Sequence, residues 1–166
     1  MMTEVLVDYQ VNEKTMALVP AKHERARTLV LETNGEFYVE EPVVSIIEQA
    51  CLEGGSSYEG RKQAVIHRIG VKHKAPIPIC PLSGIYAFPT HSIRSFENIW
   101  LFYTHVLLFE EFNDGTIPKT MITFSNKESI TVPLSHYSVN QQMKRTRQCI
   151  GQFSPTSFFT QRGFFT

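Results

Sequence analysis

The stretch TLVLETNGEFYVEE at residues 28–41 decides the fold class of this 166-residue sequence. Asn34-Gly35 separates two runs rich in apolar and β-branched residues, which is the strongest short-range signal for a β-hairpin. Directly after it, residues 43–51 carry apolar side chains at helical spacing with polar side chains on the other face. A hairpin that leads into an amphipathic helix indicates a fold that mixes antiparallel strands with helices.

Outside this unit the chain consists of short extended segments and a late helix. We expect extended segments over residues 4–9, 15–19, 64–71, 74–90 and 98–112, a hairpin over 119–134, and a Ser-capped helix with a basic second half over 135–150. Prolines in residues 74–90 favour an edge or irregular strand. Neither a repeat nor a linker divides the sequence. We therefore predict a single α+β domain of short antiparallel strands and hairpins, with an early amphipathic helix and a late basic helix.

The composition excludes several classes of protein. Hydrophobic residues make up 42% and charged residues 19%, which is ordinary for a soluble globular domain. The N-terminus lacks the pattern of a signal peptide, and the longest apolar stretch, residues 99–109, is too short to cross a membrane. Three widely spaced cysteines predict reduced thiols in a cytoplasmic protein. Scattered histidines and the absence of a nucleophile motif support neither a metal site nor catalysis.

Charge is segregated along the chain although the formal net charge is zero. Residues 1–59 hold eleven acidic residues against four Lys or Arg residues, whereas residues 60–96 hold six Lys or Arg residues and no acidic residue. Residues 97–128 are again acidic, and residues 129–166 carry four Lys or Arg residues and no acidic residue. A polyanion responds to the local field of a surface, so this pattern predicts a basic face, unless folding mixes the blocks and cancels them.

The sequence EGGSSYEGRK at residues 53–62 is a candidate phosphate-binding segment. Backbone amides, two hydroxyls, a tyrosine and Arg61-Lys62 are all groups from which phosphate oxygens accept hydrogen bonds. The glycine spacing fits neither common nucleotide-binding fingerprint. Alternatively, the glycines only form a turn and Ser56 with Glu59 forms a helix-capping box. The residues themselves leave both interpretations open.

Six fragments together resemble a known family. They are GSSYEGRK at 55–62, KAPI at 74–77, FPTHS at 88–92, Trp100, FSN at 124–126, and Gln142 followed by Arg145-Thr146. Their order and spacing are similar to those of the ComK-like competence transcription factors of Gram-positive bacteria. The resemblance spans nearly the whole chain, with residues 1–150 as the DNA-binding domain.

The resemblance implies an activator of DNA-uptake genes that binds A/T-rich promoter boxes largely through the minor groove. It implies double-stranded DNA as a partner, a homodimer or higher oligomer of the chain on that DNA, and an adaptor of a Clp protease. We expect a location at the cytoplasmic nucleoid and, from the residues themselves, no cofactor and no membrane. We combine it with the charge pattern to predict the DNA-binding residues. These are Ser56, Ser57, Tyr58, Arg61, Lys62, Arg68, Lys72, Lys74, Lys144 and Arg145.

The C-terminal residues 151–166 depart from the resemblance. Family members continue with a longer, charged tail, whereas SPTSFFTQRGFFT carries four phenylalanines and no acidic residue. We treat this segment as an atypical tail that puts activation and adaptor recognition in question. Two alternatives to the activator remain: an enzyme that processes nucleotides or phosphoesters with residues 54–62, and a remnant that no longer activates transcription.

Overall fold

The hairpin over residues 28–41 forms as the sequence predicts, in a computed structural model that describes residues 4–155. Strands β3 (Thr28–Glu32) and β4 (Gly35–Val39) pair antiparallel, with Glu32 opposite Gly35. Helix α1 (Val43–Glu53) follows and buries the apolar face that its spacing predicts. The hairpin thus contributes two strands to one sheet, and α1 is the helix that covers a face of that sheet.

A seven-stranded sheet forms the centre of the domain. Its other strands are β1 (Val5–Leu6), β2 (Thr15–Pro20), β5 (Ile77–Cys80), β6 (Ile85–Pro89) and β7 (Trp100–Phe102). The order is β1-β4-β3-β2-β7-β6-β5, and every pair is antiparallel except β1 with β4. The proline-rich strand β5 lies at the edge, where a missing N–H does not interrupt the sheet, as predicted.

A three-stranded antiparallel sheet and a long helix complete the domain. Strands β8 (Val106–Phe112), β9 (Lys119–Phe124) and β10 (Ser129–Val132) lie in the order β10-β9-β8. Residues 98–112 therefore form two strands, β7 and β8, and the hairpin expected over residues 119–134 is β9 with β10. Helix α3 (His136–Phe153) begins after Ser135, whose side chain accepts a hydrogen bond from the Ser138 amide at 3.1 Å.

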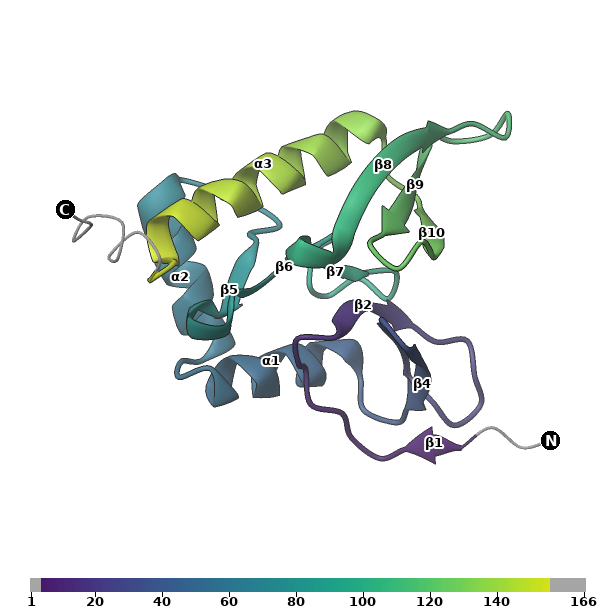
Figure 1. The fold of residues 1–166 in the computed structure, drawn as a ribbon, viewed down its shortest axis with the longest axis horizontal. Coiled ribbons are helices and arrows are strands. Elements are labelled where there is room, and N and C mark those ends of the chain that lie inside the picture. Colours follow the sequence, from purple (N-terminus) through teal and green to yellow (C-terminus); the bar gives the residue numbers. More distant parts are fainter. Residues whose placement is uncertain (1–3, 156–166) are drawn as a thin grey trace.

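Both faces of the large sheet are covered, which explains why its central strands are apolar throughout. One face packs on α1 through a cluster that includes Leu18, Trp100 and Ile47. The other face packs on the small sheet and α3 through Phe88, Leu101 and their neighbours. Figure 1 shows the two helices on opposite sides of β5, β6 and β7, with α1 below these strands and α3 above them. The alternation of Trp100 and Leu101 between the two clusters follows the two-residue period of a strand.

Residues 64–69 belong to a helix, so the strand predicted over residues 64–71 is wrong. Helix α2 (Tyr58–Ile69) buries Val65 and ends at Gly70, which has φ +72° in the left-handed region that favours glycine. Val65 and Ile69 are one helical turn apart and pack into the same cluster. A short apolar run fits a strand or a helix equally well by period alone, so the local sequence could not decide between them.

A third apolar cluster joins α2 to the second half of α3. Its buried members are Val65, Val71, Ala75, Tyr86 and Cys149, and Ile150 and Phe153 pack against it. Helix α3 runs without interruption past residue 150, the boundary expected between the domain and the tail, to Phe153. Residues 156–166, with the four phenylalanines of the tail, lie outside the described part of the chain.

Candidate nucleic-acid interface

The glycine-rich turn at residues 54–57 is shaped by backbone packing. A Cβ on Gly54 would come within 2.1 Å of the Ile79 carbonyl oxygen of β5, so only glycine fits there. The left-handed residue of the turn is Gly55, at φ +106°, whereas Gly54 has φ −80°. Ser57 caps α2 by accepting a hydrogen bond from the Gly60 amide at 2.9 Å. The start of α2 is thus capped by Ser57, and not by the Ser56–Glu59 capping box that the sequence predicts.

Tyr58 and Arg61 turn toward the interior. The Tyr58 ring meets the Trp100 ring edge-on at a centroid distance of 6.3 Å, and burial raises the pKa of Tyr58 to about 12. Arg61 Nη2 donates a 2.7 Å hydrogen bond to the Gly54 carbonyl, and the Arg61 side chain is half-buried. Both residues therefore connect the start of α2 to its surroundings.

Helix α2 separates the predicted binding residues into two groups. Ser56, Ser57 and Tyr58 lie at its start, beside α1 and the end of β5. Arg68 lies in its last turn, about 15 Å beyond Tyr58 along the helix axis, and Lys72 and Lys74 follow it. Lys62 is half-buried on the first half of the helix. The predicted set therefore does not form one continuous patch.

The end of α2 and the segment after it, which carry Arg68, Lys72 and Lys74, do contact α3, although the two regions are about 70 residues apart in sequence. The exposed Arg68 guanidinium lies 5.4 Å from the centre of the Phe153 ring of α3. Arg145 Nη1 approaches the His73 carbonyl at 3.5 Å. Lys144 is exposed on the same helix. Arg68, Lys72, Lys74 and Arg145 thus lie around one surface, where the end of α2 and the segment after it meet α3.

A buried glutamine holds this surface together. Gln142 is 3% exposed, and its Nε2 donates two 2.9 Å hydrogen bonds, to the carbonyls of Lys74 and Pro89. Its Oε1 accepts a hydrogen bond from Arg145 Nη1 at 3.1 Å. Lys74 has φ +52°, a conformation uncommon outside glycine, which the bond to its carbonyl helps to fix. The fragment Gln142…Arg145-Thr146 therefore positions two loops relative to α3.

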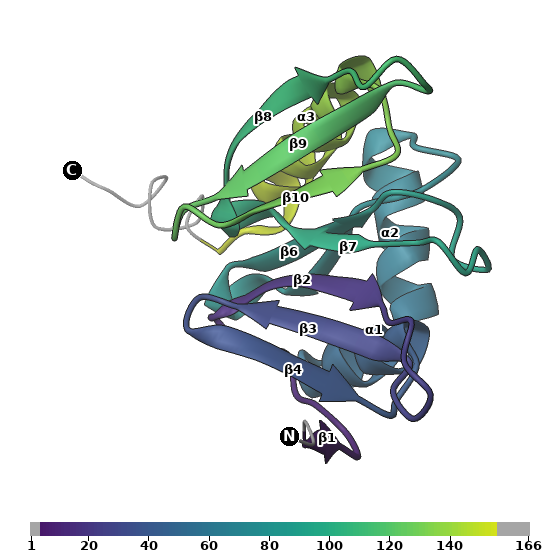
Figure 2. The same cartoon turned by 90° about the vertical axis from the view of Figure 1, so that its right-hand side faces the viewer.

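Strand pairing brings three loops to one end of the large sheet. Leu18 of β2 lies opposite Trp100 of β7, so the loop that follows β2 (residues 21–27) adjoins the loop that precedes β7 (residues 90–99). Ile77 of β5 lies opposite Ala87 of β6, so the segment before β5 (residues 70–76) reaches the same end. Figure 2 shows these loops leaving the sheet on its right-hand side.

These loops and the neighbouring arginine of α3 form a cationic surface, which we call the basic edge. Its members are Lys22, Arg25, Arg27, Lys72, Lys74, Arg94 and Arg145. The described part of the chain holds two ion pairs, Lys119 with Asp114 at 2.8 Å and His91 with Glu97 at 4.0 Å, and neither involves this set. The acidic residues in the same three loops are Glu24 and Glu97. The basic edge therefore keeps an excess of positive charge that is not paired within the described residues.

Four of these seven cations are absent from the sequence-based set of binding residues. Lys22, Arg25 and Arg27 lie in the acidic block of residues 1–59, whose negative total conceals them. The local run KHERAR at residues 22–27 is the signal that could have revealed them. Arg94 belongs to the acid-free block, but nothing local distinguishes it. Only the pairing of β2 with β7 shows that these loops are neighbours.

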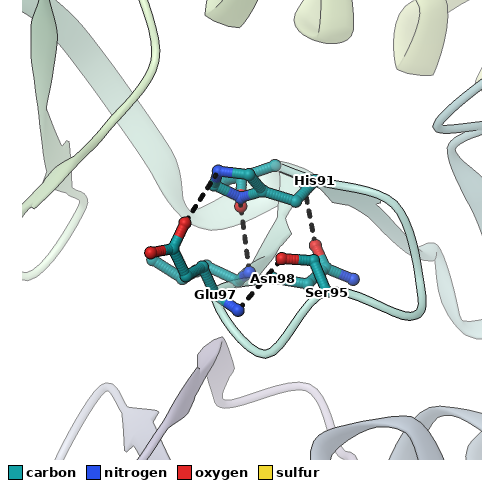
Figure 3. A network of polar contacts seen from close by, with 6 residues as sticks. His91, Ser95, Glu97 and Asn98 are labelled. Atoms are coloured by element: carbon teal, nitrogen blue, oxygen red, sulfur yellow. Dashed lines mark hydrogen bonds and ion pairs between the residues drawn. The ribbon is translucent and has the colours of Figure 1, made fainter.

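The loop of residues 90–99 is held by its own polar network, drawn in Figure 3. At its base the Thr90 hydroxyl accepts a 2.9 Å hydrogen bond from the Ile99 amide, and the Thr90 amide donates one to the Ile99 carbonyl. Asn98 Oδ1 accepts from the His91 amide at 3.0 Å, and the His91 imidazole faces the Glu97 carboxylate. These bonds therefore fix the conformation of the loop, which projects from the basic edge.

Comparison with known proteins assigns the family. The family model for the ComK protein matches residues 6–156, nearly the whole chain. The chain belongs to the ComK family. It is 33% identical over 142 residues to the competence transcription factor of Bacillus subtilis (strain 168), an alignment that covers 85% of this chain and 72% of that protein. No solved structure matches the chain significantly.

Membership in the ComK family makes the chain a competence transcription factor and excludes the enzyme alternative. The glycine-rich turn is consistent with this assignment, because its two glycines serve a close approach and a left-handed turn. None of the described helices is long and apolar enough to span a membrane. Within residues 4–155, no group of three or more potential metal ligands occurs.

Proposed function

We propose that this ComK family member binds A/T-rich promoter DNA with its basic edge, largely through the minor groove. The observation that carries the proposal is the gathering of seven cations on three neighbouring loops and α3 without carboxylate partners in the described structure. Phosphate oxygens attract such a surface, and the release of counterions from DNA drives the binding. The family membership supplies the class of function.

The shape of the basic edge favours the minor groove. A helix with its side chains is about 10–12 Å across and fits the major groove, whereas the minor groove is only about 6 Å wide. On the basic edge the cations lie mostly on loops, and α2 and α3 pack against the protein core through their buried faces. Exposed arginines such as Arg25 and Arg94 suit a narrow A-tract minor groove, whose negative potential is enhanced.

Among the residues predicted from the sequence, we assign DNA contacts first to Lys72, Lys74 and Arg145, with Arg68 and Lys144 beside them. Ser56, Ser57, Tyr58, Arg61 and Lys62 are assigned to a supporting region at the start of α2, because most of their contacts stabilise the turn and the helix. Variants in the first group should change DNA affinity with little effect on stability, and variants in the second group should do the reverse.

A second copy of the chain is the proposed protein partner on repeated promoter boxes. Strand β8 is an edge of the three-stranded sheet, and Leu107, Leu108 and Phe112 on it are 50%, 41% and 41% exposed. An unpaired edge with apolar side chains is a ready site for pairing with another strand. Binding to a Clp-protease adaptor and a location at the nucleoid belong to the same proposal through the family resemblance.

The test is a fluorescence-anisotropy titration of the full chain with two duplexes of equal length. One duplex carries spaced A-tract and T-tract boxes and the other is G·C-rich. We expect selective binding to the first, weakened roughly 60-fold between 50 and 200 mM salt, as for a salt slope near −3. Equal affinity for both duplexes, or affinity that does not change with salt, would contradict the proposal. Weak binding to both would support the remnant alternative.

A third duplex separates the two grooves. Replacing A·T pairs with inosine·cytosine pairs keeps the minor-groove surface of A·T pairs, because inosine lacks the 2-amino group, but it changes the major-groove pattern. A protein that binds through the minor groove should retain its affinity for the inosine duplex. Affinity as weak as that for the G·C-rich duplex would show that the major groove is read instead.

A further inference from the structure

The most exposed large apolar side chain in the described structure belongs to Phe96, in the loop of residues 90–99. It is 96% exposed, so the ring has no packing role in the folded chain. Single exposed apolar residues are common on protein surfaces and carry no meaning by themselves. Two features of Phe96 indicate a function, namely the hydrogen bonds that hold the backbone around it and its position on the basic edge.

The backbone on both sides of Phe96 is fixed by short-range hydrogen bonds. The Ser95 amide donates to the Ser92 carbonyl at 3.0 Å, and the Asn98 amide donates to the Ser95 carbonyl at 3.3 Å. The Ser95 hydroxyl accepts a hydrogen bond from the Glu97 amide at 3.1 Å, as Figure 3 shows. Together with the network at the base of the loop, these bonds hold the backbone at the loop tip in place, so the Phe96 ring projects from a fixed position.

Neighbouring side chains point to nucleic acid as the ligand of this loop. Ile93 packs against the apolar cluster under the sheet and anchors the loop, whereas Arg94 is exposed. The loops on either side supply Arg25 and Lys72. Among the described residues, none of the other exposed large hydrophobic side chains lies in these three loops. A protein partner would need an apolar patch, but Phe96 is a lone aromatic ring among cations.

We propose that Phe96 is a wedge that inserts between two stacked base pairs from the minor groove, with Arg94 in the groove beside it. Proteins that bind the minor groove use apolar side chains in this way, and insertion unstacks one base step and bends the duplex. Flexible pyrimidine–purine steps such as TA are the easiest to open. The inference rests on the proposed function, because it requires that the basic edge faces DNA.

The experiment uses 2-aminopurine, an adenine analogue whose fluorescence rises when it is unstacked. The probe is placed in turn at each adenine of the A/T-rich duplex, one probe per duplex. Its 2-amino group lies in the minor groove, so anisotropy verifies separately that each labelled duplex still binds the full chain. The variants are Phe96→Ala, which removes the wedge, and Phe96→Leu, which keeps an apolar wedge. The matched control is Leu82→Ala, because Leu82 is 84% exposed at the opposite end of the sheet, in the turn between β5 and β6.

We expect saturating wild-type protein to raise the fluorescence severalfold at one or two adjacent positions. Phe96→Ala should abolish the rise and weaken binding about tenfold, which corresponds to ~1.4 kcal/mol. Phe96→Leu should keep most of the rise, and Leu82→Ala should behave as wild type. Because Phe96 contacts little of the folded chain, all these variants should fold normally, which circular dichroism verifies.

The possible results separate the wedge from DNA binding itself. Saturated binding without a fluorescence rise at any position would overturn the wedge and leave the proposed function intact. A rise that persists in Phe96→Ala would also overturn it. If wild-type protein does not bind the duplex at all, the proposed function fails. If Phe96→Ala changes only the association of protein copies, Phe96 is a protein contact and the wedge is wrong.

Discussion

Replacing Gln142 with leucine should both destabilise the fold and loosen the basic edge. The side chain is 3% exposed, and its Nε2 donates to two backbone carbonyls, those of Lys74 and Pro89. Leucine has nearly the same size but cannot donate a hydrogen bond. The substitution therefore removes three hydrogen bonds, these two and the one that Gln142 Oε1 accepts from Arg145, while it leaves the packing volume almost unchanged.

The magnitude follows from the two carbonyls that lose their donor. A buried polar group without a partner costs about 1–3 kcal/mol, so two cost about 2–6 kcal/mol. The extra apolar atoms of leucine offset about 1–2 kcal/mol of this. We expect the free energy of unfolding to fall by about 3 kcal/mol. For a domain of this size, that corresponds to a decrease in Tm of roughly 6–12 °C.

Urea unfolding followed by circular dichroism measures this loss, with Gln141→Leu as the matched control. Gln141 bonds only the exposed Tyr137 hydroxyl, so its replacement should change stability by less than about 0.5 kcal/mol. At 20 °C, where both variants are folded, Gln142→Leu should also bind A/T-rich DNA several-fold more weakly than Gln141→Leu. A loss of stability below about 1 kcal/mol in Gln142→Leu would refute the role of this side chain as the tie between the loops.

Three further predictions concern the interior and α2. Ser57→Ala removes the N-cap of α2 and should lower the free energy of unfolding by about 1 kcal/mol, measured by urea unfolding; no change would contradict the cap. Arg61→Ala removes the hydrogen bond to the Gly54 carbonyl at the end of α1 and should lower the free energy of unfolding by about 1–3 kcal/mol. The salt slope of DNA binding should not change. A slope reduced by about 1 would show instead that Arg61 contacts a phosphate. Burial raises the pKa of the Cys51 thiol from 9.0 to about 11 and that of Cys149 to about 12. The two thiols then bind more protons in the folded state than in the unfolded state above pH 9, so their contribution to stability should be constant below pH 8 and fall as the pH rises from 9 to 11; stability that increases over this window would contradict buried, protonated thiols.

The sequence predicts those elements whose local signals agree with their tertiary environment. The Asn34-Gly35 turn specifies its hairpin through backbone conformation alone, and α1 combines a helical apolar face with a proline at its start. Helix α2 was missed because its buried face is narrow and Val65 is its single fully buried residue. A weak helical period and a short strand then look alike until tertiary contacts are known.

The interface could be predicted only in part, since it is assembled by pairing between distant strands. The acid-free block indicates Lys72 and Lys74, which lie in one of the three loops of the proposed interface. Arg25 and Arg94 are almost 70 residues apart, and only the register of β2 with β7 makes their loops neighbours. The motif residue Gln142 resembles a surface polar residue in the sequence, yet it is buried and supports the loops that carry the cations.

The most direct test of the account compares salt slopes of DNA binding for single cation variants. Lys72→Ala and Arg94→Ala lie on the basic edge, whereas Lys14→Ala, the control, removes an exposed lysine just before β2, at the opposite end of the sheet. If the basic edge faces DNA, each edge variant weakens binding to A/T-rich duplex and reduces the salt slope by about 1, and Lys14→Ala leaves both unchanged. If the slope is unchanged in the edge variants but falls in Lys14→Ala, DNA binds at the other end of the sheet and the account is wrong.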